Sequence, residues 1–189
     1  MYYLMGIDLG TSSTKTAIYT EEGALLSLAS AEYPVVQPAP GYMEQDPALW
    51  WQAVKNTIKK ALFEANIAST DIAGIGLTGQ MQGLVMLDAA GALLSPTIIW
   101  CDGRTEAECS EMTEKIGRDT FLSVTGNPAM IGLTAGKLLW VKNHLPEVYQ
   151  KCAHILLPKD YIRYLLTGEM ATDYNDASAA SCKMNCPNK

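Results

Sequence analysis

The sequence predicts an α/β domain built on a mixed β-sheet with flanking helices. Three strand-like segments joined by short turns occupy residues 2–33, and further strands then alternate with helical segments. Strands joined by tight turns pair antiparallel, whereas strands separated by a helix usually pair in parallel, so one sheet should contain both kinds of pairing. The chain has 189 residues, 48% hydrophobic and 18% charged, which suits one domain with a substantial core and no internal linker.

The first half of the chain carries a local signal for each expected element. The opening strands meet at two turns, 10–13 and 21–23. Asp46 and Pro47 start a helix that runs to about Asn66, because aspartate is a good N-cap and proline suits the first helical position. The pattern also predicts a loop at 34–45, a buried strand at 72–77, a polar turn at 78–83, a strand at 84–87, a hairpin turn at 88–91 and a short strand at 97–100.

The second half is mostly helical. Gly117 and Gly168 are expected to end two helices, because glycine readily adopts the left-handed conformation that follows a last helical turn. Thr134 is expected to cap a third helix. The other predicted elements are a short helix at 118–124, a turn at 125–128, strands at 153–157 and 170–173, a helix start at Pro158 and a tail from residue 177 without a clear element.

Charge and cysteine content narrow the class of protein. The net charge of −6 argues against nucleic acid as a default partner. No apolar run approaches the length of a membrane span, and the apolar N-terminus lacks the basic residues of a signal peptide, so no membrane partner is expected. Five irregularly spaced cysteines suggest reduced thiols and a cytoplasmic location.

Residues 6–16 have the composition of an anion site in a hairpin turn. The first strand ends in Asp8, and the turn then offers backbone donors, hydroxyl groups and a positive charge at Gly10, Thr11, Ser12, Ser13 and Lys15. Asp8 would repel a bare phosphate, but it can hold the Mg²⁺ that a nucleotide brings. The alternative is a tight hairpin that is merely rich in turn residues.

Two more polar clusters follow predicted strands. Gln80 and Gln82 offer neutral donors and acceptors, and Asp102 and Arg104 offer one charge of each sign. Because sites in open α/β sheets gather at the carboxyl ends of strands, the three clusters would line one cleft if those ends lie side by side. Such a mixture suits a polyhydroxyl ligand, on which Trp100 could stack. The alternatives are a structural ion pair for Asp102 and Arg104 and a core position for Trp100.

Six stretches, in order, resemble one protein family. The first is similar to the phosphate motif D-x-G-T/S-x-x-x-K of the actin, Hsp70 and sugar-kinase superfamily, whose domains have a ribonuclease H-like fold. The whole set reaches about residue 176 and resembles the N-terminal part of an FGGY-family carbohydrate kinase, nearest to the xylulose kinases. The stretches are GIDLGTSSTK (6–15), EQDPALWW (44–51), GLTGQMQG (76–83), IIWCDGRT (98–105), TGNPAMIGLTAGKLLWVK (125–142) and LPKDYIRYLLTGE (157–169).

The resemblance implies that the γ-phosphoryl group of ATP is transferred, with Mg²⁺, to a hydroxyl of a sugar, most simply a ketopentose such as D-xylulose. It assigns Asp8 to ordering the magnesium ion and the turn residues up to Lys15 to facing the phosphates. Met81 and Gln82, after Gln80, match a substrate-contact pair. Trp100, Asp102 and Arg104 match a stretch at the sugar end of the cleft.

The chain departs from the family pattern in two ways. Xylulose kinases usually carry histidine in place of Gln82, and glycerol kinases carry an Arg-Glu pair in place of Met81 and Gln82, so the identity of the sugar stays open. Family members are also much longer, and their proton-accepting aspartate, in a G-G-x-D-N stretch, would fall beyond residue 189. Residues 1–189 are therefore expected to be a truncated N-terminal domain that lacks its C-terminal nucleotide-binding partner domain and is inactive alone.

Two alternative functions remain at this stage. The same fold could serve as a non-catalytic module that binds a sugar or a nucleotide. It could also serve as an ATPase that needs no sugar, although the clusters at 80–82 and 100–104 would then have no purpose. A homodimer is also left open.

Overall fold

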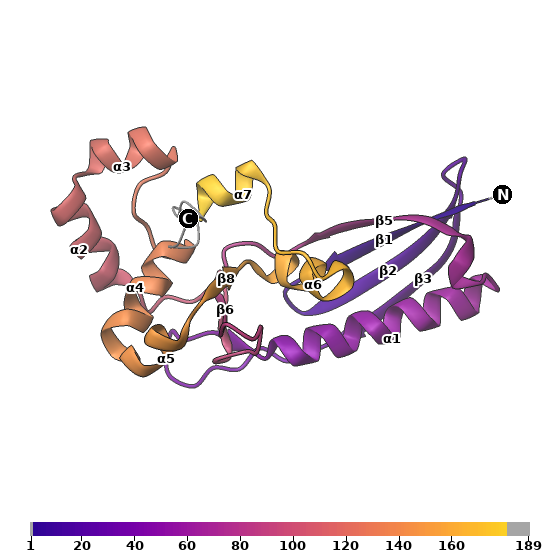
Figure 1. Cartoon of the computed structure of the whole chain (residues 1–189), viewed down its shortest axis with the longest axis horizontal. Helices are drawn as coiled ribbons and strands as arrows, with labels where there is room; N and C mark the ends of the chain where they lie inside the picture. Colours follow the sequence, from indigo (N-terminus) through magenta and orange to yellow (C-terminus); the bar gives the residue numbers. More distant parts are fainter. Residues whose placement is uncertain (1, 181–189) are drawn as a thin grey trace.

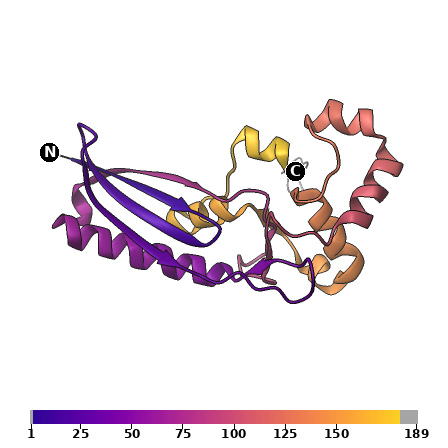
Figure 2. The ribbon, with the colours of Figure 1, turned by 180° about the vertical axis from the view of Figure 1, so that it is seen from behind.

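The computed structural model describes residues 2–180 of the chain. The strands are β1 (Tyr3–Leu9), β2 (Ser13–Thr20), β3 (Leu25–Glu32), β4 (Glu44–Gln45), β5 (Ile72–Gly79), β6 (Val85–Leu87), β7 (Thr97–Ile98) and β8 (His154–Leu156). The helices are α1 (Pro47–Ala65), α2 (Glu106–Ile116), α3 (Arg118–Thr125), α4 (Thr134–His144), α5 (Pro146–Lys151), α6 (Pro158–Thr167) and α7 (Tyr174–Ala179), with a 3₁₀ turn at Ser69–Asp71. Figures 1 and 2 show α1 running along the largest sheet, while α2 to α5 gather at the end of the molecule far from the N-terminus.

The main sheet is mixed, as the sequence predicts. Its strand order is β3-β2-β1-β5, with antiparallel pairs β1–β2 and β2–β3 and a parallel pair β1–β5. The strand predicted at 72–77 is confirmed as β5, but its predicted burial is wrong, because β5 lies at the edge of this sheet and none of its residues is buried. Only β1 pairs with it, so its other edge gains no cover from a neighbouring strand.

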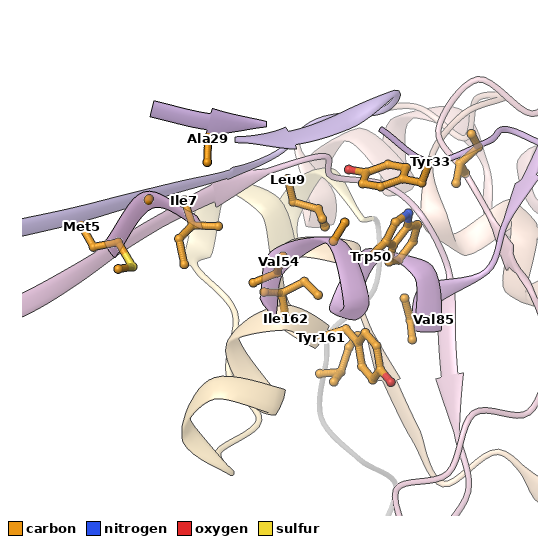
Figure 3. Packing of buried hydrophobic residues seen from close by; sticks show 14 of the residues in the cluster. Met5, Ile7, Leu9, Ala29, Tyr33, Trp50, Val54, Val85, Tyr161 and Ile162 are labelled. Atoms are coloured by element: carbon orange, nitrogen blue, oxygen red, sulfur yellow. The ribbon is translucent and has the colours of Figure 1, made fainter. Parts of the chain in front are cut away.

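Helix α1 covers one face of the sheet. Side chains alternate between the two faces of a strand, and Met5, Ile7 and Leu9 of β1 point toward α1. There they pack in one buried cluster with Trp50 and Val54 of the helix, as Figure 3 shows. The helix begins as predicted, because the Asp46 side chain accepts a hydrogen bond from the backbone N–H of Ala48 at 2.8 Å. This packing leaves the opposite face of the sheet available for other roles.

Strand β6 joins two hydrophobic clusters. Val85 and Leu87 point into the cluster beneath α1, whereas Leu84, just before the strand, and Met86 point into a second cluster that includes Val141 of α4. The alternation of side chains along an extended segment explains this division. Strand β6 pairs antiparallel with β8, and β4 pairs antiparallel with β7, so the chain beyond the main sheet is held by two small ribbons.

The C-terminal part of the described chain differs from the prediction. Residues 170–173 form no strand, because Asp173 instead caps α7 by accepting a hydrogen bond from the N–H of Asp176 at 2.9 Å. The Lys159 ammonium group also lies 2.8 Å from Asp173 and 2.9 Å from Asp176. The tail from residue 177 was expected to lack an element, yet its first residues complete α7, and residues 181–189 lie outside the described part.

Other local predictions also fail where long-range contacts dominate. Strand β4 falls inside the predicted loop at 34–45, and α5 occupies a segment for which no element was predicted. Thr134 starts α4 but makes no capping hydrogen bond, because its hydroxyl points to Gln82. None of the helices between residues 2 and 180 has the length and apolar character that a membrane crossing requires.

Candidate functional site

The turn after β1 is held by its own backbone and by one tyrosine. Gly10 donates its N–H to the carbonyl of Ser13 at 3.0 Å, and a Cβ atom at Gly10 would lie 2.9 Å from that same oxygen. Only glycine avoids that clash. Tyr33 fastens the turn from outside, with its hydroxyl donating to the Gly10 carbonyl and its N–H donating to the carbonyl of Ser12 at 3.1 Å. Burial, and then the charge of Asp8, raise the pKa of the Tyr33 hydroxyl.

Asp8 and Lys15 lie on the face of the sheet opposite α1. They are directly paired across β1 and β2, and Asp8 is paired with Thr78 across β1 and β5. A hollow of about 450 Å³ opens on this face, and its lining includes these three residues, Gly6 and Gly76. One carboxylate and one ammonium group therefore border an open space at the carboxyl end of β1. The two predicted charges at the phosphate end thus lie together.

The carboxyl end of β5 lies beside the turn after β1. Gln80 donates its N–H to the carbonyl of Leu9 at 2.7 Å, which extends the parallel pairing by one step. A Cβ atom at Gly79 would lie 2.6 Å from the Leu9 Cβ and 2.8 Å from its carbonyl oxygen. Glycine at this position lets the two strand ends approach each other. The first two polar clusters therefore lie side by side, which is the condition that a shared cleft requires.

Gln45 connects these strand ends and was missed by sequence reasoning. Its amide nitrogen donates to the carbonyl of Thr11 at 2.7 Å, and its amide oxygen accepts from Trp50 Nε1 at 3.2 Å and from Gln80 Nε2 at 3.0 Å. The indole can only donate, so it fixes the orientation of both amides. Gln80 is consequently buried and engaged inside the protein, with its Oε1 atom unpartnered among the described residues. A glutamine just before the Asp46 cap was the available signal.

Trp100 brings the third cluster to the same turn. Its indole N–H donates to the Thr11 hydroxyl at 2.9 Å, across 89 positions of sequence. The side chain is 50% exposed, so the alternative of a core position is wrong. An exposed indole face next to a polar turn is suited to stacking on the apolar face of a sugar.

Asp102 and Arg104 form a buried ion pair. The guanidinium Nη2 lies 2.7 Å from Asp102 and 2.8 Å from Glu44, and Asp102 also accepts the backbone N–H of Met43 at 2.6 Å. The Asp102 residue is 1% exposed, and the Arg104 guanidinium lies over the ring of Tyr42 at 3.9 Å. This geometry matches the alternative of a structural ion pair, since the two charges face each other. Through their contacts, Asp102 and Arg104 connect residues 42–44 with the segment after β7.

Gln82 has an unusual backbone conformation. Its φ angle is +63°, in the left-handed region that residues other than glycine rarely adopt. Lys137 of α4 donates to the Gln82 carbonyl at 2.9 Å, and the Thr134 hydroxyl lies 3.5 Å from the Gln82 amide oxygen. Met81, next to it, is 46% exposed. Met81 and Gln82, the predicted substrate-contact pair, thus lie at the surface, and Lys137 holds their backbone from the interior of the protein.

Lys137 is the second residue that sequence reasoning missed. It is fully buried, and burial lowers the pKa of its ammonium group to about 8, while the charge of Asp102 acts in the opposite direction. The sequence held a signal: Lys137 lies four residues before the buried Val141, on the inward face of α4. A lysine at such a position needs internal partners.

The donor set at Asp8 fits a magnesium ion that arrives with a nucleotide. Residues 2–180 contain no group of three or more histidine, cysteine or acidic side chains placed to hold a metal. A single open carboxylate suits Mg²⁺, which keeps most of its waters and binds phosphate oxygens. Three of the five cysteines, Cys101, Cys109 and Cys152, belong to the described residues, and the remaining two lie outside them.

Comparison with known proteins identifies a family. Residues 3–186 match the model of the FGGY family of carbohydrate kinases, N-terminal domain. The chain is 43% identical over 178 residues to the xylulose kinase of Bacillus subtilis, covering 94% of this chain and 36% of that protein. It therefore spans little more than a third of the length of such relatives.

Solved structures agree with this assignment. The crystal structure of a xyloylose kinase from Brucella ovis matches with a TM-score of 0.90 and 37% identity, over 95% of this chain and 37% of that one. A gluconate kinase from Lactobacillus acidophilus matches with a TM-score of 0.86 and 30% identity, over 95% and 36%. These are sugar kinases of the actin and Hsp70 type, so the predicted ribonuclease H-like fold is confirmed.

Proposed function

The chain belongs to the FGGY family of carbohydrate kinases, and from this premise we propose that it is the N-terminal domain of an enzyme that phosphorylates a ketopentose such as D-xylulose, using MgATP. The observation that carries the proposal is the convergence on Thr11. Trp100 donates to the Thr11 hydroxyl, and the Gln45 side chain links the Thr11 carbonyl to Gln80 at the end of β5. A phosphate end and a sugar end in contact are what a phosphoryl transfer requires, because both substrates must meet in line.

At the phosphate end, the chain's own residues position charge. Asp8 would accept hydrogen bonds from the waters of the magnesium ion and so hold the triphosphate by its metal. Lys15 lies beside it in the same hollow and would neutralise phosphate charge. The turn from Gly10 to Ser13 offers backbone and hydroxyl donors to phosphate oxygens, and its rigidity limits reorganisation during the transfer.

At the sugar end, neutral groups and one aromatic ring face the solvent. Met81, Gln82 and Trp100 would contact the sugar, with Trp100 covering an apolar face and Gln82 binding a hydroxyl. Gln80, Asp102 and Arg104 belong to this end too, and we assign them a supporting role because the Gln80 amide nitrogen donates to Gln45 and the other two side chains form an ion pair. Glutamine at 82 can bind a hydroxyl but cannot take its proton.

The proton acceptor and the adenosine site would lie outside residues 1–189, in the part of such kinases that this chain does not span. We therefore propose that the chain acts with its own C-terminal domain and has no turnover alone. Nucleic acid and membranes are not proposed as partners, the proposed location is the cytoplasm, and the homodimer remains a prediction.

The deciding experiment measures ATP consumption by the native, full-length protein across ketopentoses, ketohexoses, polyols and gluconate, with Asp8→Asn as the control. We expect turnover with one ketopentose, which disappears in the control and in residues 1–189 alone. ATP hydrolysis that is indifferent to every sugar would instead favour a sugar-independent ATPase. Sugar binding without any ATP consumption would favour a non-catalytic binding module.

A further inference from the structure

Two segments of the proposed sugar end meet at the buried ammonium group of Lys137. It donates to the carbonyls of Gln82 at 2.9 Å, of Leu133 at 3.3 Å and of Gly132. These three bonds use all three donors of a lysine ammonium. Gly132 in turn lies against Trp100, because a Cβ atom there would be 3.1 Å from the Trp100 carbonyl oxygen.

Helix α4 is held close to this region by a small residue. A Cβ atom at Gly136 would lie 3.2 Å from Cys109 Sγ and 3.3 Å from Thr105, so α4 rests directly on the start of α2. Lys137 follows Gly136 and reaches away from that contact toward the end of β5. The lysine therefore connects the segment after β7 with the loop that carries Met81 and Gln82.

Stability alone does not account for a buried ammonium group at this position. Removing such a charge from water is unfavourable, and packed apolar side chains often replace buried charges without loss of stability. The strained backbone of Gln82 also needs an explanation. A left-handed conformation is unfavourable at a residue other than glycine and persists only where its surroundings impose it.

We infer that Lys137 is a positioning residue of the sugar site: by binding the Gln82 carbonyl it holds Gln82 in the left-handed conformation that presents its side chain to the substrate. The inference rests on the function proposed above. The Thr134 hydroxyl faces the Gln82 amide oxygen, so the amide nitrogen is the atom left to meet an oxygen of the sugar. Lys137 itself is fully buried and touches no substrate.

The test compares the same substitution at two lysines of α4 in the native, full-length protein. Lys137→Met removes the three hydrogen bonds at similar side-chain volume, and Lys142→Met is the control, because Lys142 is exposed and lies 6.0 Å from the Tyr149 ring. For Lys137→Met we expect the KM for the sugar to rise about tenfold or more, while the KM for ATP changes less than about twofold. Lys142→Met should leave both values unchanged.

A crystal structure of the Lys137→Met protein gives a readout that does not depend on turnover. We expect Gln82 to leave the left-handed region while α4 and the main sheet keep their positions. If Gln82 keeps its conformation, or if the two KM values rise together, the inference is wrong. Should the wild-type protein act on no sugar, the proposed function fails, yet this structure still shows whether Lys137 sets Gln82. If Lys137→Met does not fold, Lys137→Gln, which keeps an amide donor, replaces it in both measurements.

Discussion

Replacing Asp102 with asparagine tests whether the Asp102–Arg104 pair supports the site or serves the substrate directly. The carboxylate accepts the backbone N–H groups of Met43 and Arg104 and the Nε and Nη2 groups of the guanidinium, at 2.6 to 3.0 Å. Asparagine would turn an NH₂ group toward some of these donors and leave the guanidinium with Glu44 alone. Because breaking a buried pair leaves an uncompensated charge, we expect a loss of about 3–5 kcal/mol in the free energy of unfolding.

Urea unfolding followed by circular dichroism measures this loss, which corresponds to a fall in Tm of roughly 10 °C for a domain of this size. Asp119→Asn, an exposed carboxylate in the first turn of α3, is the control and should change stability by about 0.5 kcal/mol or less. Combining Asp102→Asn with Arg104→Met should cost less than the sum of the two single changes, because each single change already breaks the pair. A loss below about 1 kcal/mol together with a large rise in the KM for the sugar would refute the supporting role.

Three further predictions concern the groups that hold the site together, and urea unfolding measures each. Burial lowers the pKa of Lys137 to about 8 from a usual value of 10.5, so the unfolded chain binds this proton more tightly than the folded protein does. The free energy of unfolding should therefore rise by about 3 kcal/mol between pH 8 and 10.5, and Lys137→Met should lack this rise. Gly79→Ala should lower the free energy of unfolding by about 2 kcal/mol, because the new Cβ would collide with Leu9. Gly74→Ala on the same strand is the control: its Cβ would meet only one methyl group, at 3.8 Å, and the loss should be far smaller. Gln45→Leu should lower the free energy of unfolding by about 2–4 kcal/mol, since it leaves two buried side-chain donors and a backbone carbonyl without their partner. A loss near zero would mean that water replaces the amide.

Local pattern predicted the main sheet and its long helix. Several features appear where they were expected, because each depends on neighbours in sequence. They are the turns at 10–13 and 21–23, the Asp46 cap and strand β5. The exposure of β5 was not predictable in the same way. Small apolar residues describe a strand that permits close packing, but they do not state how many strands lie beside it.

The polar contacts of the site depend on residues far apart in sequence, and this is where prediction stopped. The bond between Trp100 and Thr11 joins positions 89 apart, and that between Lys137 and Gln82 joins positions 55 apart. Motif resemblance named both partners of the first bond and only Gln82 of the second as site residues, and it gave no geometry for either bond. It also placed Asp102 and Arg104 at the sugar end without showing that their charges face each other.

The proposed kinase site has a phosphate end and a sugar end that are built by different means, and this has a consequence for substrate specificity. The phosphate end is set by the backbone: strand pairing, and glycines at 10 and 79 where any side chain would collide. The sugar end is set by buried side chains, chiefly Lys137 and the Asp102–Arg104 pair, which fix loops from beneath. A substitution at the sugar end can therefore change the ligand that is bound while the phosphate end stays intact. Such a division would allow solved kinases named for xylulose and for gluconate to share this architecture so closely.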